Sequence, residues 1–103
     1  MDINNKTAVV TGGGNGIGKA LCVALAEAGA NVVIADIELD AAEAVKAEIS
    51  ATGAGCLALA VDVTDEGSVN RMRDAAQEAF SSVDILVNNA GVMHPTKPLF
   101  ETS

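Results

Sequence analysis

The chain has 103 residues, enough for one small domain with a single core and too few for two. Half of its residues are hydrophobic and 19% are charged, a composition typical of a compact domain and not of a disordered tail. Acidic residues outnumber basic residues by 14 to 6, and the net charge of -8 argues against nucleic acid and anionic membrane surfaces as partners.

Four short hydrophobic runs follow one another along the chain, separated by three stretches with helical periodicity. The runs span residues 8–10, 32–35, 57–61 and 85–87, and they are continuous, as in strands buried on both faces of a parallel sheet. The helical stretches carry apolar stripes that comprise Ile17, Leu21, Ala24, Leu25 and Ala28, then Leu39, Ala42, Val45 and Ile49, and then Val69, Met72, Ala76, Ala79 and Phe80. The alternation of strand and helix predicts an α/β fold with parallel pairing.

The N-terminal segment, the two cysteines and the two prolines add further expectations. The start has neither a basic segment followed by an apolar one nor an Arg-rich amphipathic segment, so we expect no targeting sequence and a cytoplasmic location. Cys22 and Cys56 lack metal-ligand spacing and are expected to be small core residues without a disulfide. Near the other end, Pro95 and Pro98 predict a loop that includes His94, which we expect to be exposed and not a metal ligand.

A glycine-rich segment, residues 11–18 with the sequence TGGGNGIG, lies between the first predicted strand and the first predicted helix. Glycines let a ligand approach the backbone, and the following helix directs free N–H groups toward it, which suits a phosphate. The GxGxxG pattern fits no register here. The GxxxxGK[ST] phosphate loop fails because Ala20, after Gly18 and Lys19, has no hydroxyl for Mg²⁺. A turn without any ligand is the remaining alternative.

The pattern TGxxxGxG does fit residues 11–18, and on this segment the chain resembles the short-chain dehydrogenase/reductase family. Two further motifs carry the resemblance: the sequence NNAG at residues 88–91, after the fourth run, and an Asp-Val pair at residues 62–63, after the third. The resemblance covers the whole chain but only the N-terminal part of the family's domain. It implies the NAD-binding half of an oxidoreductase that transfers a hydride between a nicotinamide cofactor and a secondary alcohol or ketone.

The resemblance also implies which residues bind the cofactor. They are Gly12, Gly14, Asn15, Gly16, Ile17, Gly18, Asp36, Ile37, Asp62, Val63, Asn89, Ala90 and Gly91. In the family, the asparagine that corresponds to Asn89 satisfies backbone groups at the end of a strand and lies beside the cofactor ribose, and we expect both roles here. Gly91 is expected to let the backbone pass close to the nicotinamide, with a plain turn as the alternative.

Asp36 ends the second predicted strand, at about the spacing from the glycine segment at which a dinucleotide fold places an acid on the adenosine ribose. A carboxylate there accepts hydrogen bonds from ribose hydroxyls and repels a 2′-phosphate. Asn15 and Ile37 occupy the positions where NADP-using relatives carry basic residues, so NAD is the expected cofactor. The alternative is that Asp36 caps the next helix, but Asp40 lies nearer the start of that helix's apolar stripe.

Asp62 ends the third predicted strand and is expected to accept a hydrogen bond from the adenine amino group, while the Val63 N–H donates to a ring nitrogen. Thr64 and Asp65 are typical of a helix N-cap, which is expected to leave Asp62 free for the ligand. Lys19 is expected to be a solvated surface charge.

The family's catalytic residues cannot be placed on this chain. Relatives use a later Ser and a Tyr-x-x-x-Lys pair to move the proton, whereas this sequence has no Tyr. We therefore assign no catalytic residue and expect the chain alone to be inactive.

The expected fold is a Rossmann-type sheet with the strand order 3-2-1-4. With right-handed crossovers, this order places two helices on one face of the sheet and one on the other. Its fourth strand would be an open apolar edge, which stable domains avoid. We therefore expect residues 1–103 to be the N-terminal part of a single dinucleotide-binding domain, incomplete relative to a full doubly wound domain.

Two functions remain open at this point. The first is the oxidoreductase just described, whose partner is a small alcohol or ketone and which can form a homo-oligomer when full length. The second is a truncated, non-catalytic module that binds NAD(H) or pairs with a partner through its open edge. They are distinguished by whether the coding sequence continues in frame into a segment with Ser and Tyr-x-x-x-Lys.

Overall fold

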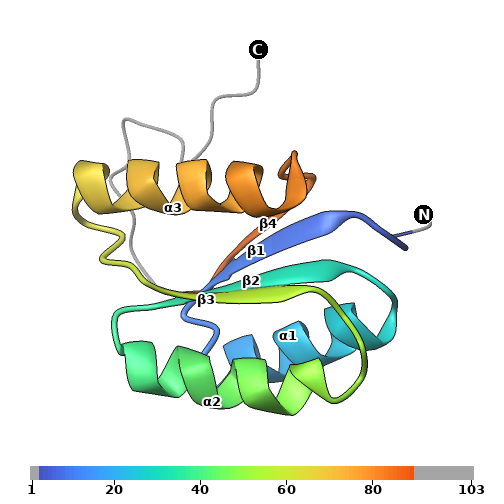
Figure 1. The fold of residues 1–103 in the computed structure, drawn as a ribbon. Coiled ribbons are helices and arrows are strands. Elements are labelled where there is room, and N and C mark those ends of the chain that lie inside the picture. The colour runs from blue at the N-terminus through green and yellow to red at the C-terminus, as the bar shows by residue number, and fades with distance from the viewer. Residues whose placement is uncertain (1–2, 90–103) are drawn as a thin grey trace.

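The computed structural model describes residues 3–89, which form four strands and three α-helices in alternation (Figure 1). The strands are β1 (Thr7–Thr11), β2 (Asn31–Asp36), β3 (Cys56–Ala60) and β4 (Ile85–Asn88). The helices are α1 (Gly16–Glu27), α2 (Leu39–Ser50) and α3 (Glu66–Phe80). All strand pairs are parallel, which confirms the predicted α/β fold.

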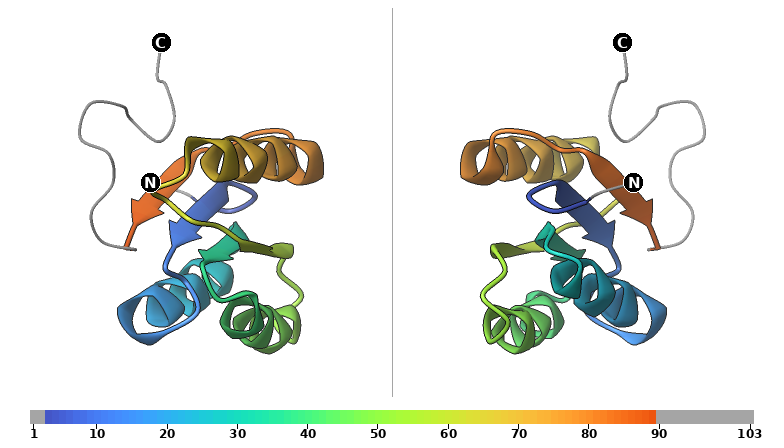
Figure 2. Two further views of the ribbon diagram at one scale, coloured as in Figure 1. Left: turned by 90° about the vertical axis from the view of Figure 1, so that its left-hand side faces the viewer. Right: turned by 90° about the vertical axis from the view of Figure 1, so that its right-hand side faces the viewer.

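The sheet has the order β3-β2-β1-β4, as predicted. Helices α1 and α2 cover one face, and α3 covers the other (Figures 1 and 2). Because the strands are parallel, their four carboxyl ends lie at the same edge of the sheet, and the loops that follow them start from that edge. No helix in the described part of the chain is long and apolar enough to cross a membrane.

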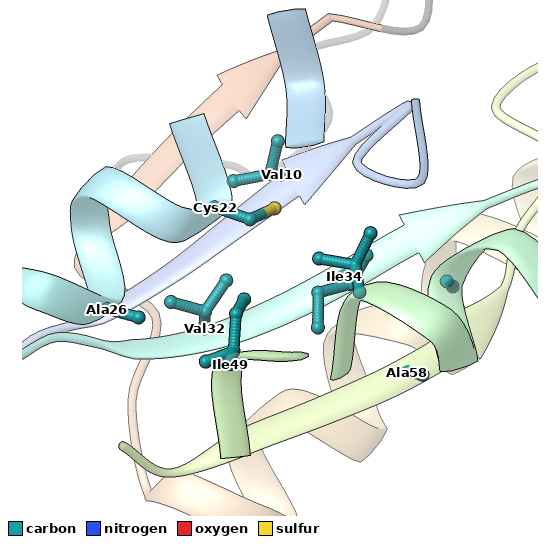
Figure 3. Packing of buried hydrophobic residues seen from close by; sticks show 9 residues of the cluster. Val10, Cys22, Ala26, Val32, Ile34, Ile49 and Ala58 are labelled. Carbon is teal, nitrogen blue, oxygen red and sulfur yellow. The ribbon is translucent and has the colours of Figure 1, made fainter. Parts of the chain in front are cut away.

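The core lies on both sides of the two central strands. Strands β1 and β2 are buried along their lengths, except for the half-buried Asn31. The cluster beneath α1 and α2 comprises Val10, Cys22, Ala26, Val32, Ile34, Ala42, Val45, Ile49 and Ala58 (Figure 3). The cluster beneath α3 comprises Val9, Val33, Ala35, Val61, Val69, Met72 and Ala76. Burial of these side chains provides the main driving force for docking the helices on the sheet.

Two of the predicted strands are less buried than expected. Strands β3 and β4 are the edge strands, so each has a single neighbour, and only Ala58 of their residues is fully buried. Leu86 of β4 shares the α3 face with its register partner Val9 but is 36% exposed. The predicted end of the third strand at Asp62 is wrong: β3 ends at Ala60, and Val61, just beyond it, is buried under α3. The cysteines are both free, Cys22 in the core and Cys56 half-buried.

The predicted apolar stripe of α1 is only partly correct: its member Leu25 packs half-buried against the core, but the buried residues of the helix are Gly18, Cys22 and Ala26. Ile17 and two alanines of that stripe are exposed, Ile17 by 71%. The fully buried positions of the helix carry its smallest side chains, which a search for large apolar residues overlooks. The stripes of α2 and α3 are correct except at their ends, where Leu39 and Ala79 are exposed.

Asp84 joins the start of β4 to the start of β1. Its N–H donates to the carbonyl oxygen of Thr7, and the Thr7 N–H donates to the Asp84 carboxylate, both at 2.9 Å. The Ser82 hydroxyl donates to the same carboxylate oxygen at 3.2 Å. The Thr7 bond, helped by the Ser82 bond and the charge of Lys6, lowers the pKa of Asp84 below its ordinary value.

Replacing this carboxylate, as in Asp84→Ala, is expected to lower the thermal unfolding midpoint, because the N–H of buried Thr7 loses its acceptor. A lowered folded-state pKa means that the ionised group stabilises the fold above its unfolded-state pKa, and that this contribution is lost as the pH falls through the folded-state pKa. The deficit of the variant should therefore be full at pH 7 and shrink below about pH 4. Circular dichroism melts across this range measure it, with Asp74→Ala on the exposed side of α3 as the control; a deficit independent of pH would contradict the assignment.

Candidate functional site

Polar and glycine residues gather at the carboxyl edge of the sheet, which faces the viewer in the left panel of Figure 2. Three connections begin there: the glycine segment between β1 and α1, the turn between β2 and α2, and the turn between β3 and α3. The end of β4, with Asn89 directly after it, lies at the same edge. The topology therefore brings together all the predicted site residues that lie within residues 3–89.

The glycine segment brings the start of α1 directly against the end of β1. A Cβ atom on Gly18 would collide with the carbonyl oxygen of Gly12, so only glycine permits this close approach. Gly16 has φ of 56°, in the left-handed region, and a Cβ atom there would meet nothing within 4 Å. The segment is therefore tightly packed against the protein at Gly18 and open on its outer side at Gly16.

The first turn of α1 offers unused hydrogen-bond donors. Asn15 is the N-cap residue, but its side chain makes no capping hydrogen bond. The N–H groups of Gly16, Ile17 and Gly18 have no acceptor among residues 3–89. The positive end of the helix dipole lies at the same place. This arrangement suits an anion, as the glycine pattern predicts.

Asp36 is buried, with 8% of its surface exposed, and both of its carboxylate oxygens accept backbone hydrogen bonds. The Gly14 N–H donates to Oδ2 at 3.0 Å, and the Glu38 N–H donates to Oδ1 at 2.9 Å. The carboxylate thus ties the glycine segment to the turn after β2. The prediction that Asp40 caps α2 is wrong. Glu38 is the N-cap residue, its side chain makes no capping hydrogen bond, and Asp40 lies in the first turn of the helix.

The turn after β3 holds Asp62 by several hydrogen bonds. Its Oδ1 accepts from the Thr64 hydroxyl at 2.6 Å and from the Thr64 N–H at 2.9 Å, and these bonds, the hydroxyl foremost, lower the pKa of Asp62. The expectation that Asp62 is free is therefore wrong for this oxygen. Asp65 caps α3 as predicted, since its side chain accepts from the Gly67 N–H at 3.0 Å. The Val63 N–H has no acceptor within residues 3–89.

Asn89 links the end of β4 to the glycine segment. Its Nδ2 donates to the carbonyl oxygen of Gly12 at 3.3 Å, and its N–H donates to the Thr11 hydroxyl at 3.1 Å. That hydroxyl in turn donates to Oδ1 of Asn88 at 3.0 Å. Asn89 therefore satisfies a backbone carbonyl as expected, while its place beside a ribose stays a prediction.

Several other predicted residues are placed more simply. Ile37 is 70% exposed at the start of the turn after β2. Lys19 is a surface charge as expected, and its ammonium group pairs with Glu48 of α2 at 3.3 Å. The predictions for Ala90, Gly91 and His94 lie outside the described residues.

Sequence reasoning missed one buried polar residue of this edge. Ser68, 8% exposed in α3, accepts the Asp62 N–H through its hydroxyl at 3.0 Å. It directly precedes Val69, the first member of the apolar stripe, and a serine in that position has no distinctive sequence signal. Only the fold shows that its hydroxyl reaches back to the turn.

The family model for short chain dehydrogenases matches residues 6–103. The chain is 43% identical to a 1-deoxy-11-beta-hydroxypentalenate dehydrogenase of Streptomyces exfoliatus, over 98% of this chain and 37% of the relative. It is 46% identical to a sorbitol dehydrogenase of Cereibacter sphaeroides, over 89% of this chain and 35% of the relative.

Solved structures show the same similarity. A hydroxysteroid dehydrogenase from Escherichia coli superposes with a TM-score of 0.84 at 43% identity, over 87% of this chain and 38% of that one. A 7α-hydroxysteroid dehydrogenase in complex with NADH and 7-oxo glycochenodeoxycholic acid gives 0.81 at 42% identity, over 84% and 34%. The chain thus spans little more than a third of the length of these proteins.

Two glycine substitutions are expected to have opposite effects on stability, because only one of the two glycines lies where α1 closely approaches β1. Gly18→Ala is expected to cost about 1–3 kcal/mol of unfolding free energy, because the added methyl group collides with the backbone at Gly12. Gly67→Ala in α3, where the methyl group meets only ordinary contacts, is expected to be neutral or to stabilise by up to about 1 kcal/mol. Urea unfolding of the two variants measures both, and equal stabilities would show that Gly18 does not limit the helix position.

Proposed function

We propose a function from one premise: the chain belongs to the short chain dehydrogenase family. Residues 1–103 form the N-terminal part of a dinucleotide-binding domain in an oxidoreductase that transfers a hydride between NAD(H) and a secondary alcohol or ketone. The observation that carries this proposal is the meeting of the uncapped start of α1 with Asp36 at one edge of the sheet. The similarity to a dehydrogenase solved with NADH supports a nicotinamide cofactor.

The glycine segment is the proposed site of the cofactor's pyrophosphate. The residues involved are Gly12, Gly14, Asn15, Gly16, Ile17 and Gly18. The N–H groups of Gly16, Ile17 and Gly18, together with the positive end of the helix dipole, can bind an anion. The open side of Gly16 leaves room for it. The negative charge of the chain disfavours anions in general, so this local arrangement has to supply the attraction.

Asp36 is the proposed ligand of the adenosine ribose and the reason for choosing NAD. Each carboxylate oxygen can accept a further hydrogen bond besides the one it has, so the ribose hydroxyls can bind without breaking the bonds to Gly14 and Glu38. A 2′-phosphate would meet a buried carboxylate that these bonds hold in place. Asn15 and Ile37 offer it no positive charge.

The remaining predicted residues are proposed to bind the two ends of the cofactor, the adenine and the nicotinamide. We place the adenine against Asp62 and Val63, with the exposed Ile37 beside it, because Ile37 directly follows Asp36 and the other two residues lie in the turn after β3, the strand that pairs with β2. We place the nicotinamide ribose by Asn89 and the ring by Ala90 and Gly91, as the family resemblance implies. The nicotinamide supplies the hydride donor or acceptor when it is bound.

What the described residues contribute to the reaction is binding and orientation. Asn89 holds the Gly12 carbonyl oxygen with its amide, so the phosphate-binding turn and the end of β4 move as one. Thr11 joins the same network through its hydroxyl. This chain offers the reacting oxygen no tyrosine to exchange a proton with, because the sequence contains none. The proton-transferring group belongs to the rest of the proposed enzyme.

The cofactor preference is the first test. We expect NADH to bind at least about tenfold more tightly than NADPH, a difference of ~1.4 kcal/mol, because Asp36 repels the 2′-phosphate. Asp36→Asn should reduce this ratio, whereas Asp40→Asn, which removes the same charge from the first turn of α2, should leave it unchanged. Nicotinamide fluorescence titrations measure both ratios. Equal affinity of the unaltered protein for the two cofactors would remove Asp36 from the ribose site.

The second test concerns catalysis. The chain of residues 1–103 is expected to show only background hydride transfer, because a positioned proton-transfer group is typically worth ~10²–10⁴-fold in rate and no such group can be assigned here. NADH absorbance with a panel of secondary alcohols measures it. Turnover should appear in a protein extended along its reading frame into a Ser and Tyr-x-x-x-Lys segment. Turnover by residues 1–103 that is lost in His94→Ala would contradict this account.

The alternative function is a non-catalytic module that binds NAD(H) or pairs with a partner through its open edge. It predicts tight NADH binding by residues 1–103 and a reading frame without that segment. The two readings thus differ in the extended sequence and not in the site described above.

A further inference from the structure

We propose that Thr64 and Ser68 are positioning residues that fix Asp62 and the Val63 N–H for one purine base, and that through them the protein distinguishes adenine from hypoxanthine cofactors. The inference rests on the proposed function and deepens it. It assigns roles to two residues that the sequence motifs do not include.

The backbone of the turn after β3 is held from both sides. Ser68 reaches back from α3, and its buried hydroxyl accepts the Asp62 N–H at 3.0 Å. The Asp65 N–H donates to the Asp62 carbonyl oxygen at 3.0 Å. On the sheet side, the Val61 N–H donates to the carbonyl oxygen of Asp36 at 2.9 Å. The turn is therefore fixed relative to the proposed ribose ligand.

The Asp62 side chain is oriented separately, by Thr64. The hydroxyl and the N–H of Thr64 both donate to Oδ1, at 2.6 Å and 2.9 Å. Two donors on one oxygen set the side-chain torsion and leave Oδ2 without a partner among residues 3–89. The same bonds keep the carboxyl group ionised, since they lower its pKa. Next to it, the Val63 N–H also lacks an acceptor in the described part of the chain.

The turn thus presents one fixed acceptor, Oδ2 of Asp62, beside one fixed donor, the N–H of Val63. Adenine offers the complementary pair, because its 6-amino group donates and its N1 accepts. Hypoxanthine inverts both groups, since its O6 accepts and its N1 carries a hydrogen. It would place an acceptor against a carboxylate and a donor against an N–H, and a site built for specific hydrogen bonds rejects such an analogue strongly.

Discrimination of this kind depends on orientation as well as on the carboxylate itself. A freely rotating Asp62 could turn Oδ2 away from O6 of hypoxanthine, and a mobile turn could withdraw the Val63 N–H. Thr64 prevents the first adjustment and Ser68 the second. Their loss should therefore reduce the selectivity for the base more than the affinity for the cofactor.

The experiment compares the binding of NADH and of reduced nicotinamide hypoxanthine dinucleotide to the intact protein by fluorescence titration. We expect the unaltered protein to prefer NADH by at least about tenfold. Thr64→Val and Ser68→Ala should each lower that ratio at least fivefold, and Thr64→Ser, which keeps the hydroxyl, should preserve it. Matched controls are Thr52→Val, in the turn after α2, and Ser82→Ala, before β4. The Thr52 hydroxyl donates to the carbonyl oxygen of Ile49 at 2.7 Å, and both residues lie at the opposite edge of the sheet.

A second ratio separates positioning from general loosening of the fold. Because Asp36 is intact in all of these variants, their preference for NADH over NADPH should not change. A collapse of both ratios in Thr64→Val and Ser68→Ala would overturn the inference in favour of a structural role, and so would an unchanged base preference. Thr64 is exposed, so its variants decide the question even where Ser68→Ala fails to fold.

The outcome also separates this inference from the function beneath it. An unaltered protein that binds NADH tightly but does not prefer it to the hypoxanthine analogue overturns the inference alone. An unaltered protein that binds neither dinucleotide overturns the proposed function and this inference with it.

Discussion

The rest of the site depends on the close approach between Gly18 and the carbonyl oxygen of Gly12. No side chain fits between them, so α1 starts directly above the end of β1. The same carbonyl oxygen accepts the side-chain amide of Asn89, which follows β4. A helix start, a central strand and an edge strand are thus fixed at one backbone atom. The unused N–H groups of α1 come to lie at the carboxyl edge of the sheet because of this contact.

Asp36 complements this contact from the neighbouring strand. Burying a carboxylate without partners is costly, and here two backbone N–H groups offset that cost. One of them belongs to the glycine segment, so the proposed ribose ligand and the proposed phosphate loop are parts of one hydrogen-bonded unit. Geometry at one proposed subsite therefore constrains the other, without any contact between large side chains.

Much of this arrangement could be predicted from the sequence, and the failures have physical causes. Continuous apolar runs predicted the strands because parallel strands are buried on both faces, and the right-handed crossover predicted which face each helix covers. Periodicity found the buried face of α2 through Val45 and Ile49 but missed that of α1, where burial falls on Gly18 and Cys22. The position of Asp36 followed from the end of β2, whereas Asp62 lies beyond the end of β3 at Ala60, and the hydrogen-bond partners of both could not be predicted. Those partners are backbone groups and hydroxyls, which are placed only by the tertiary fold.

The pairing of β1 with β4 has a consequence for the order in which the site forms. Strands β1, β2 and β3 pair with neighbours one crossover away along the chain, while β4 returns to β1 across almost the whole described sequence. Contacts between distant parts of a chain form at a greater cost in loop entropy, so β4 is expected to join last during folding. The link between Asp36 and the glycine segment needs only β1 and β2, whereas the Asn89 link needs β4. The link between Asp36 and the glycine segment is therefore expected to form before the Asn89 link during folding.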